Sequence, residues 1–408
     1  MPSGEEGKGI FARPPYQASY PLTRALAAAS VSSLNECHWP FSRSDPPLVD
    51  SWLSSPALDN LQQLELRHYT TSCPPPLRAT AFRFAHTLGA ATFGSCILPS
   101  QPPQFPNLKL LTLEDASISD CSLHTMIVGC PTLECLLLHN ICGIRCVRIN
   151  SRSLRIIGVR DRWFRQFKDT EYQLEELVIE NAPSLEKLLS LNSTYALHLT
   201  VVSAPKLEVS GCVSDLNSGS TRLVFGSTII KGLYLDNMAA RICTVKTLAV
   251  SMKSQLSVDK AIDMLKCFPC LEKLYVKFFW KEDIMYRRTT FSWPIWKPCL
   301  DIPLKLKKIV LDQYRGNSSQ VEFAKFFVQN ATVLESMIFE VEEEHYNKEF
   351  FAHQCVVLHY KERVSSGCRY RFTTEQFHWD IGEVKHASDL DLTDPSLKSS
   401  GGSSCRLE

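Results

Sequence analysis

Apolar residues recur along the chain in the pattern LxxLxL, in which the intervening positions are mostly polar or small. Matches with leucine or another large apolar residue occur at 61–66, 108–113, 133–138, 154–159, 174–179, 230–235, 245–250, 271–276, 306–311 and 334–339, and a weaker match with alanine at one position occurs at 88–93. From Leu108 onward the first three steps are 25, 21 and 20 residues. A pattern with so short a period predicts a chain built from repeated units, each with one short strand.

A single unit of this kind cannot bury its own apolar side chains. In a strand, alternate residues point to one side, so the last two apolar residues of each unit face a core and the residue between them faces away. Stacked units would form a curved parallel sheet with return segments on the outside, which is the leucine-rich-repeat architecture. Residues 119–129 and 257–268 have helical spacing and are predicted to be two of these returns. We therefore predict an α/β fold, a solenoid with one parallel sheet and outer helices and loops.

The residues between the last two apolar positions should face the concave side of this arc. They are candidates for contact with a partner, since the concave face of a solenoid is its extended binding surface. The candidates are Thr112, Leu137, Val178, Tyr234 and Tyr275.

A second motif, PxLE, stands just before several predicted strands. Proline ends the preceding helix and favours an extended backbone in the residue before it, so each strand would begin at a defined place. The four copies lie at 131–134, 183–186, 205–208 and 269–272.

This combination resembles the leucine-rich repeats of plant F-box proteins. Residues 49–53, VDSWL, look like the segment that leads into those repeats. Three stretches resemble the C-terminal FBD domain of the family: LKLKKIVLDQYRG at 304–316, SQVEFAKFFVQNATVLESMIFEV at 319–341 and DLDLTDP at 389–395. The resemblance implies a repeat domain at 49–300 and an FBD-like domain at 301–395.

The residue pattern of the C-terminal part predicts a small α/β unit. Strands are expected at 304–314, 333–341, 355–360 and 370–373, with a helix that begins near Ser319. The unit would be either a terminal cap for the last repeat or a dedicated binding module.

Residues 1–48 are rich in Pro, Ser and Ala and lack the pattern of an F-box, and we expect them to be irregular and disordered, like the tail at 396–408. Two explanations stay open, a truncated product and a group of repeat proteins that works without an F-box. In either case the ligase adaptor and cullin should bind only if an F-box is supplied.

Composition narrows the possible partners and compartments. The chain has 408 residues, 44% of them hydrophobic, and its 44 basic and 43 acidic residues give a net charge of +1, so nothing points to a nucleic-acid or membrane partner. Neither a signal peptide nor an apolar membrane span is visible, and sixteen cysteines are too few per residue for a disulfide scaffold. We expect a location in the cytoplasm or nucleus, with reduced thiols.

Motifs for catalysis are missing from the sequence. GxSxG, GxxxxGK[ST], GxGxxG and HExxH do not occur, so we expect neither an enzyme nor a cofactor. Cys135, His139, Cys142 and Cys146 are of metal-ligating types, but they are interpreted as turn and core residues, and no metal site is predicted.

An aromatic and basic insertion separates the repeats at 271 and 306. It is either a partner-binding loop on the rim or an apolar plug beside the FBD-like unit. Its candidate contact residues are Trp280, Arg287, Arg288, Trp293 and Trp296.

The resemblance implies a non-enzymatic scaffold that recognises protein substrates for an F-box, SCF-type ubiquitin ligase. The alternative is a free-standing leucine-rich-repeat binding protein without a ligase, which could compete with full-length F-box relatives for a partner.

Overall fold

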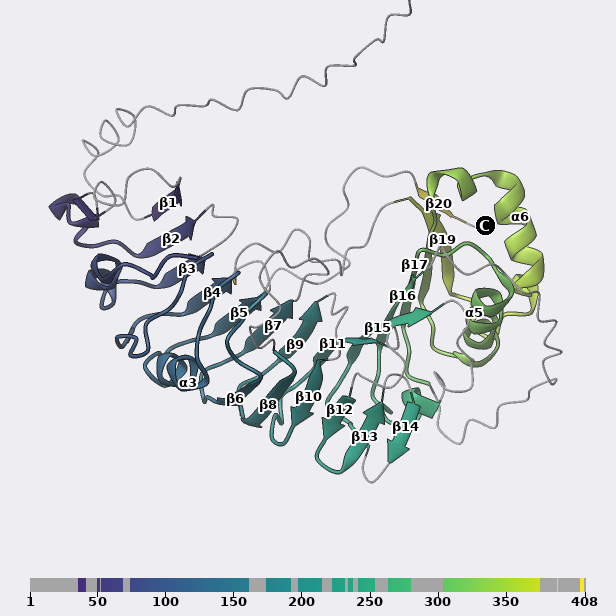
Figure 1. Ribbon diagram of the computed structural model, residues 1–408. Coiled ribbons are helices and arrows are strands. Elements are labelled where there is room, and N and C mark those ends of the chain that lie inside the picture. Colours follow the sequence, from purple (N-terminus) through teal and green to yellow (C-terminus); the bar gives the residue numbers. More distant parts are fainter. Residues whose placement is uncertain are drawn as a thin grey trace, which may run out of the picture.

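The computed structural model describes residues 36–41, 50–51, 53–68, 74–160, 174–191, 197–214, 222–231, 234–237, 241–253, 263–279, 304–374, 387 and 404–406. These residues form an arc (Figure 1). One large sheet, the inner sheet, lines the concave side of the arc, and helices together with a second sheet, the outer sheet, cover its convex side. The predicted α/β leucine-rich-repeat fold is confirmed.

The inner sheet is built from fourteen strands in the described part of the chain. Neighbouring strands run parallel, except for the last pair, β19 and β20. In spatial order the strands are β1 (Glu36–Phe41), β2 (Gln63–His68), β3 (Ala90–Gly94), β4 (Leu110–Glu114), β5 (Cys135–His139), β7 (Ile156–Arg160), β9 (Lys187–Leu191), β11 (Val209–Ser214), β15 (Thr247–Lys253), β16 (Lys273–Phe279), β17 (Lys308–Asp312), β18 (Ser336–Glu340), β19 (Arg369–Thr373) and β20 (Ser404–Arg406).

The inner strands of successive repeats begin in register with one another, and backbone hydrogen bonds explain this. The carbonyl of the residue before a strand accepts two N–H groups from the next repeat, as Glu134 O does from Arg155 (2.8 Å) and Ile156 (3.0 Å). The leucine of each PxLE motif is buried in the core beside this point, as Leu133 and Leu185 are. Strand register is therefore set by a repeated pair of hydrogen bonds and an apolar anchor.

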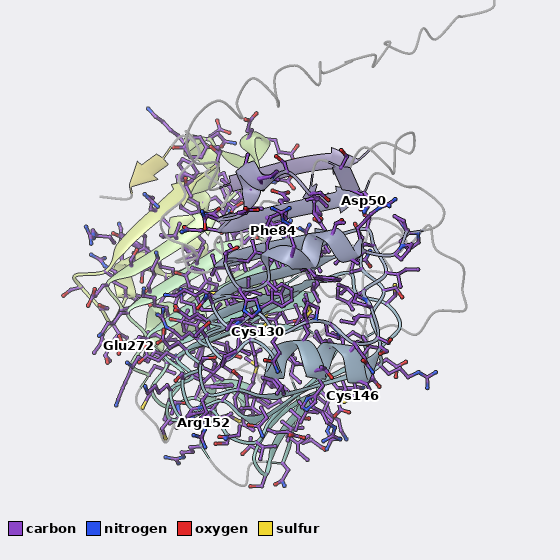
Figure 2. All side chains as sticks on the ribbon, turned by 90° about the vertical axis from the view of Figure 1, so that its left-hand side faces the viewer. Asp50, Phe84, Cys130, Cys146, Arg152 and Glu272 are labelled. Carbon is purple, nitrogen blue, oxygen red and sulfur yellow. The ribbon has the colours of Figure 1, made fainter. Side chains whose placement is uncertain are left out.

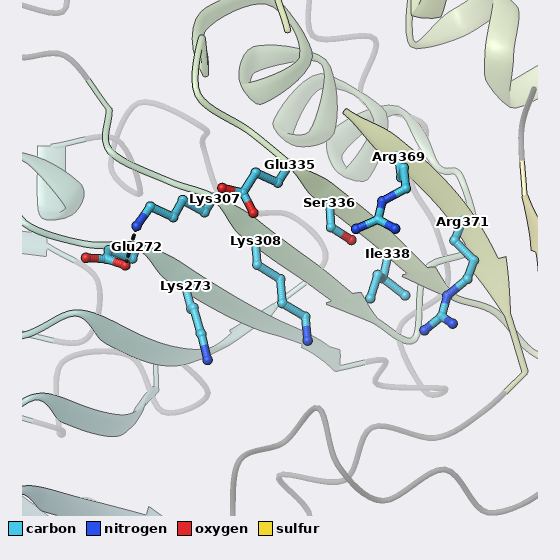
Figure 3. Close-up of a pocket in the computed structure, with 9 residues that line it drawn as sticks. All are labelled: Glu272, Lys273, Lys307, Lys308, Glu335, Ser336, Ile338, Arg369 and Arg371. Carbon is cyan, nitrogen blue, oxygen red and sulfur yellow. Dashed lines mark hydrogen bonds and ion pairs between the residues drawn. The ribbon is translucent and has the colours of Figure 1, made fainter. Parts of the chain in front are cut away.

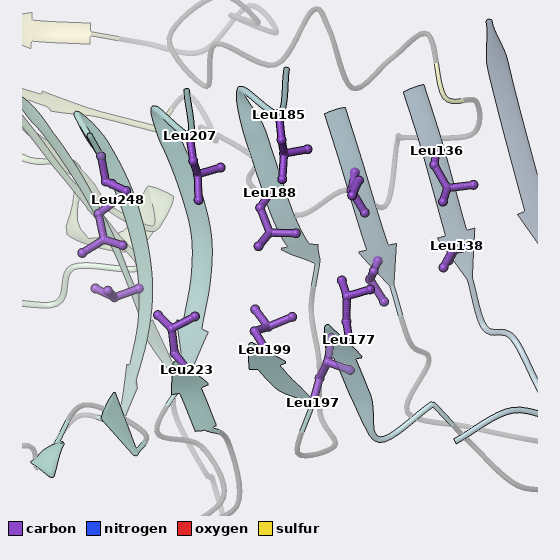
Figure 4. Packing of buried hydrophobic residues seen from close by; sticks show 14 of the residues in the cluster. Leu136, Leu138, Leu177, Leu185, Leu188, Leu197, Leu199, Leu207, Leu223 and Leu248 are labelled. Atoms are coloured by element: carbon purple, nitrogen blue, oxygen red, sulfur yellow. The ribbon is translucent and has the colours of Figure 1, made fainter. Parts of the chain in front are cut away.

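The outer sheet corrects the prediction of a single parallel sheet. Segments 174–179 and 230–235 carry the repeat pattern, yet the described strands within them belong to the outer sheet. Its strands are β6 (Cys146–Asn150), β8 (Glu176–Asn181), β10 (His198–Val201), β12 (Arg222–Phe225), β13 (Thr228–Lys231) and β14 (Tyr234–Asn237), parallel from β6 to β12 and antiparallel from β12 to β14. The middle repeats thus return through strands rather than helices, and leucines of both sheets pack against each other (Figure 4).

The predicted return helix at 119–129 is confirmed as α3 (Asp120–Val128). Ser119 is its N-cap, where the hydroxyl accepts the N–H of Ser122 (3.2 Å), and the helix ends at Gly129. Of the second predicted return, at 257–268, residues 263–266 are helical and 257–262 lie outside the described residues. Phe84, in the 3₁₀ helix η2 (Ala79–Phe84), and Cys130, after α3, lie in the buried layer behind the inner sheet (Figure 2).

The FBD-like stretch continues the inner sheet through β17, β18 and β19. Helix α5 (Ser318–Asn330) begins one residue before the predicted Ser319, because Asn317 is the N-cap and its Oδ1 accepts the N–H of Gln320 (2.9 Å). The prediction of a strand at 355–360 is wrong. Residues 355–357 end helix α6 (Lys348–Val357), which Asn347 caps and which buries Phe351 and Gln354 on one face.

Both terminal segments that were expected to be irregular contribute a strand. Strand β1 lies within 1–48 and pairs with β2, and β20 lies within 396–408 and pairs with β19. Both strands extend an edge of the inner sheet, where unpaired backbone groups are available to another segment. The remaining short elements are the 3₁₀ helices η1 (Pro56–Leu58), η3 (Glu343–His345) and η4 (Tyr360–Glu362).

Candidate binding surface on the inner sheet

The face of the inner sheet that points away from the core is built from alternate residues of each strand. Because the strands are parallel and in register, these residues form rows across the sheet. The middle row contains Glu65, Thr92, Thr112, Leu137, Gly158 and Leu189, and beyond β11 it continues with Ala249, Tyr275, Val310, Ile338 and Arg371. Thr112, Leu137 and Tyr275 therefore lie on the predicted face.

These three residues are nonetheless buried, and their contact with a partner stays a prediction. Thr112, Leu137 and Tyr275 have exposed fractions of only 1%, 1% and 3%. The inner face has its own apolar packing, because Leu137 packs with Leu189 and with Ala387 of the C-terminal segment. The N–H of Ala387 donates to Thr112 Oγ1 (2.8 Å), and Tyr275 packs in a second cluster with Ala249, Val310 and Ile338.

Two other candidates do not lie on the inner sheet. Val178 is in β8 and Tyr234 is in β14, and both strands belong to the outer sheet. The error follows from the returning strands, which repeat the same alternation of apolar and polar residues as the inner ones. Trp280, Arg287, Arg288, Trp293 and Trp296 lie outside the described residues, so contact of this loop with a partner stays a prediction.

An ion-pair network occupies the next row at the N-terminal end of the inner face. Arg67 of β2 pairs with Glu65 of its own strand and with Glu114 of β4, and Nδ1 of His139 lies 3.1 Å from Glu114 Oε1. Strand β3, which lies between β2 and β4, has Gly94 in this row. A Cβ at Gly94 would lie 2.8 Å from Arg67 Cγ, so the absence of a side chain lets Arg67 reach across β3.

A ladder of mostly alternating charges runs along the edge where the inner strands begin. Its members are the residues immediately before successive strands: Lys109, Glu134, Arg155, Glu186, Glu208, Lys246, Glu272, Lys307 and Glu335. Pairs within the ladder include Lys109–Glu134 (3.2 Å), Arg155–Glu186 (2.9 Å), Lys246–Glu208 (2.7 Å) and Lys307–Glu272 (2.9 Å).

Hydrogen bonds from the basic partners lower the pKa values of two ladder carboxyls, that of Glu186 through Arg155 and that of Glu272 through Lys307. Solvent screens these exposed pairs, so the ladder gives this edge a charge pattern rather than much stability. Sequence reasoning identified the glutamates of PxLE but missed the basic residues at the same position in other repeats. The signal was present, since each of these residues directly follows the buried apolar residue that precedes a strand.

Two hollows open along this edge. One, of about 440 Å³, lies between β9, β11 and the start of β15 and includes Glu186, Glu208 and Lys246. The other, of about 410 Å³, lies over the starts of β16–β19 and includes Lys273 and Arg371.

The cysteine and histidine cluster considered in the sequence does not form a shared ligand set. Cys135 packs on the inner face, His139 lies beside Glu114, Cys142 donates its S–H to Ala116 O (3.6 Å), and Cys146 lies in the outer sheet. All cysteines with described side chains are free thiols. In the described part of the chain, no helix has the length and apolar content needed to cross a membrane.

Comparison with known proteins agrees with this architecture. A family profile described as "FBD-associated F-box protein At5g56370, LRR repeats" matches residues 49–276, more than half of the chain, and the FBD profile matches 304–339. A curated relative, the F-box/FBD/LRR-repeat protein At5g53840 of Arabidopsis thaliana, is 24% identical over 293 residues, which is 64% of this chain and 62% of the relative. The match thus spans about three fifths of the relative's length. The chain belongs to the family of FBD-associated F-box proteins with leucine-rich repeats.

Proposed function

We propose that this chain recognises proteins that an F-box-type ubiquitin ligase marks with ubiquitin, and that it acts as a scaffold rather than as an enzyme. Family membership supports the proposal, because leucine-rich-repeat and FBD regions are generally non-enzymatic interaction modules. The observation that carries it is the continuous inner sheet, whose outward rows present charge at both ends of one curved face.

In this proposal, recognition and recruitment are separate tasks. The repeats bind the protein substrate in the cytoplasm or nucleus, while the ligase adaptor and the cullin are brought by an F-box. Since each repeat is stabilised by its neighbours, the repeats need no distant module in order to fold.

A fusion of this chain behind an F-box tests the function. It is expressed in plant cells together with tagged ubiquitin while the proteasome is inhibited, and ubiquitinated proteins are quantified by mass spectrometry. We expect a defined set of proteins to gain ubiquitin relative to cells that express the F-box alone. If both cells give the same set, the proposal is wrong. Proteins that bind the chain but never gain ubiquitin would favour a free-standing binding protein.

A further inference from the structure

The hollow over β16–β19 is lined by residues of four neighbouring strands, and β16, β17 and β19 supply its basic side chains (Figure 3). Lys273, Lys308, Ser336 and Arg369 are register partners, one from each strand, and together they form a single row. Arg371 stands two residues further along β19. In Figure 3 Lys273, Lys308 and Arg371 point to the same side of the sheet, whereas Glu272, Lys307 and Glu335 lie along its edge.

The lining of this hollow carries a net positive charge. It contains the five basic residues Lys273, Lys307, Lys308, Arg369 and Arg371 and two acidic ones, Glu272 and Glu335, which gives a net of +3 in a chain whose total is +1. The two carboxylates stand at the edge, where Glu272 pairs with Lys307 (2.9 Å). The charge of the hollow itself is therefore positive.

One of these cations lies beside an aromatic ring on the same face of the sheet. Nζ of Lys308 lies 5.8 Å from the centre of the Tyr275 ring, and Tyr275 is buried in a cluster with Val310 and Ile338. Ile338 also lines the hollow. Basic groups on a well-packed sheet lose less conformational freedom when they bind a partner than the same groups on a loop.

The spacing of the row fits an extended peptide. Neighbouring strands are about 4.8 Å apart, so Lys273 and Arg369 are separated by three intervals, or about 14 Å. An extended chain advances about 3.3 Å per residue, so four or five residues cover the row, and every second side chain faces it. Carboxylates at alternate positions of such a segment could accept hydrogen bonds from the ammonium and guanidinium groups.

We infer that this hollow binds an acidic, extended segment of the partner protein, with carboxylate side chains at alternate positions. The inference rests on the proposed function, and it names the chemistry of the substrate that the scaffold would select. A protein segment is favoured over a nucleic acid because the chain as a whole carries a net charge of only +1, which gives little general attraction for a long row of phosphates.

The test uses the full chain and a fluorescein-labelled peptide, Glu-Leu-Glu-Leu-Glu-Leu-Glu, in fluorescence anisotropy. The control peptide has glutamine in place of glutamate. The test variant is Arg369→Glu/Arg371→Glu, and Arg369→Gln/Arg371→Gln is a milder version in case charge reversal disturbs folding. The matched control variant, Arg152→Glu/Arg222→Glu, makes the same charge change at exposed positions on the turn after β6 and on β12, away from the hollow. Circular dichroism and thermal melting confirm that each variant is folded.

We expect the glutamate peptide to bind, with an affinity that falls as salt rises from 50 to 300 mM, and the glutamine peptide not to bind. Both test variants should weaken binding by about tenfold or more, whereas the control variant stays within about twofold of the original. Equal binding by test and control variants would overturn the inference. So would tighter binding of an oligo(U) RNA that the same substitutions abolish, because the surface would then bind nucleic acid.

The outcome can be separated from that of the ubiquitination experiment. Peptide binding that depends on Arg369 and Arg371, without any ubiquitinated protein in the fusion experiment, would leave the hollow as an acidic-segment site and reject the ligase role. Ubiquitination that is unchanged in the Arg369→Glu/Arg371→Glu fusion would keep the ligase role and reject the hollow as the place of recognition.

Discussion

Leu137 distinguishes the structure from the simple repeat pattern more sharply than any other residue. The pattern places it on the exposed concave face, where truncation to alanine should cost less than about 0.5 kcal/mol. The structure buries it to an exposed fraction of 1%, in a cluster with Cys135, Ile156, Leu189 and Ala387. Burial of a leucine side chain contributes about 1.5–3 kcal/mol, and the cavity that remains adds to the loss. We therefore expect Leu137→Ala to lower the free energy of unfolding by about 2–4 kcal/mol.

Urea denaturation followed by circular dichroism measures this change, and Val128→Ala is the matched control. Val128 is 62% exposed at the end of α3, so its truncation should shift the midpoint little. Because repeats can open locally, hydrogen exchange of the β5 amides is measured in parallel, and it should accelerate in Leu137→Ala alone. Indistinguishable midpoints and exchange rates for the two variants would refute the burial of the middle row.

The cluster around Leu137 can also be tested by a substitution at Ala387. Ala387→Arg places a long cation where Ala387 is 1% exposed and packed on Leu137, so we expect residue 387 to move away from the inner face. The thiol of Cys135, which belongs to the cluster, should then react faster with iodoacetamide, as measured by peptide mapping. An unchanged rate would show that Ala387 does not cover the inner face.

Three further predictions concern positions elsewhere in the fold. Gly94→Ala should lower the unfolding midpoint because its Cβ displaces Arg67, and in an Arg67→Ala background the same change should have much less effect. Gly316→Ala should destabilise by about 1–3 kcal/mol, since φ is +69° and the new Cβ would overlap the amide of Gln354; a neutral result would contradict the backbone described here. Burial raises the pKa of Cys96 to about 12, so the folded state keeps a proton that the unfolded state loses near pH 9. Stability from this group should be complete below pH 9 and lost as pH rises toward 12, and Cys96→Ala should flatten that decline in urea titrations.

The repeated core could be predicted from the sequence because its signal is local. Residues such as Leu111, Leu113, Leu136 and Leu138 follow the strand period and are fully buried. Helix α3 could be predicted for the same reason, since Ser119 caps it within the segment itself. Local patterns of this kind are set by steric and hydrogen-bond preferences of a few consecutive residues.

The candidate contact residues were harder to predict because burial on the inner face depends on distant parts of the chain. Thr112 is covered through a hydrogen bond with Ala387, 275 positions away, and no local pattern contains that contact. Val178 shows the second limit, since an outer strand and an inner strand have the same two-residue period. The basic hollow meets the first limit, because Lys273 and Arg369 come to lie in one row only through the order of the strands between them.

The FBD stretch extends the core of the repeats and also carries the hollow that we propose as a binding site. Strands β17–β19 share the core of the repeats, and α5 covers the outer side of the same strands with buried phenylalanines. The same strands supply Lys308, Arg369 and Arg371 to the hollow on the opposite face. A change that loosens the core on one face of β18 would therefore also displace the basic row on the other face. Both sets of side chains are carried by the same strands. The stability of this end of the solenoid and the order of the proposed binding surface are therefore coupled.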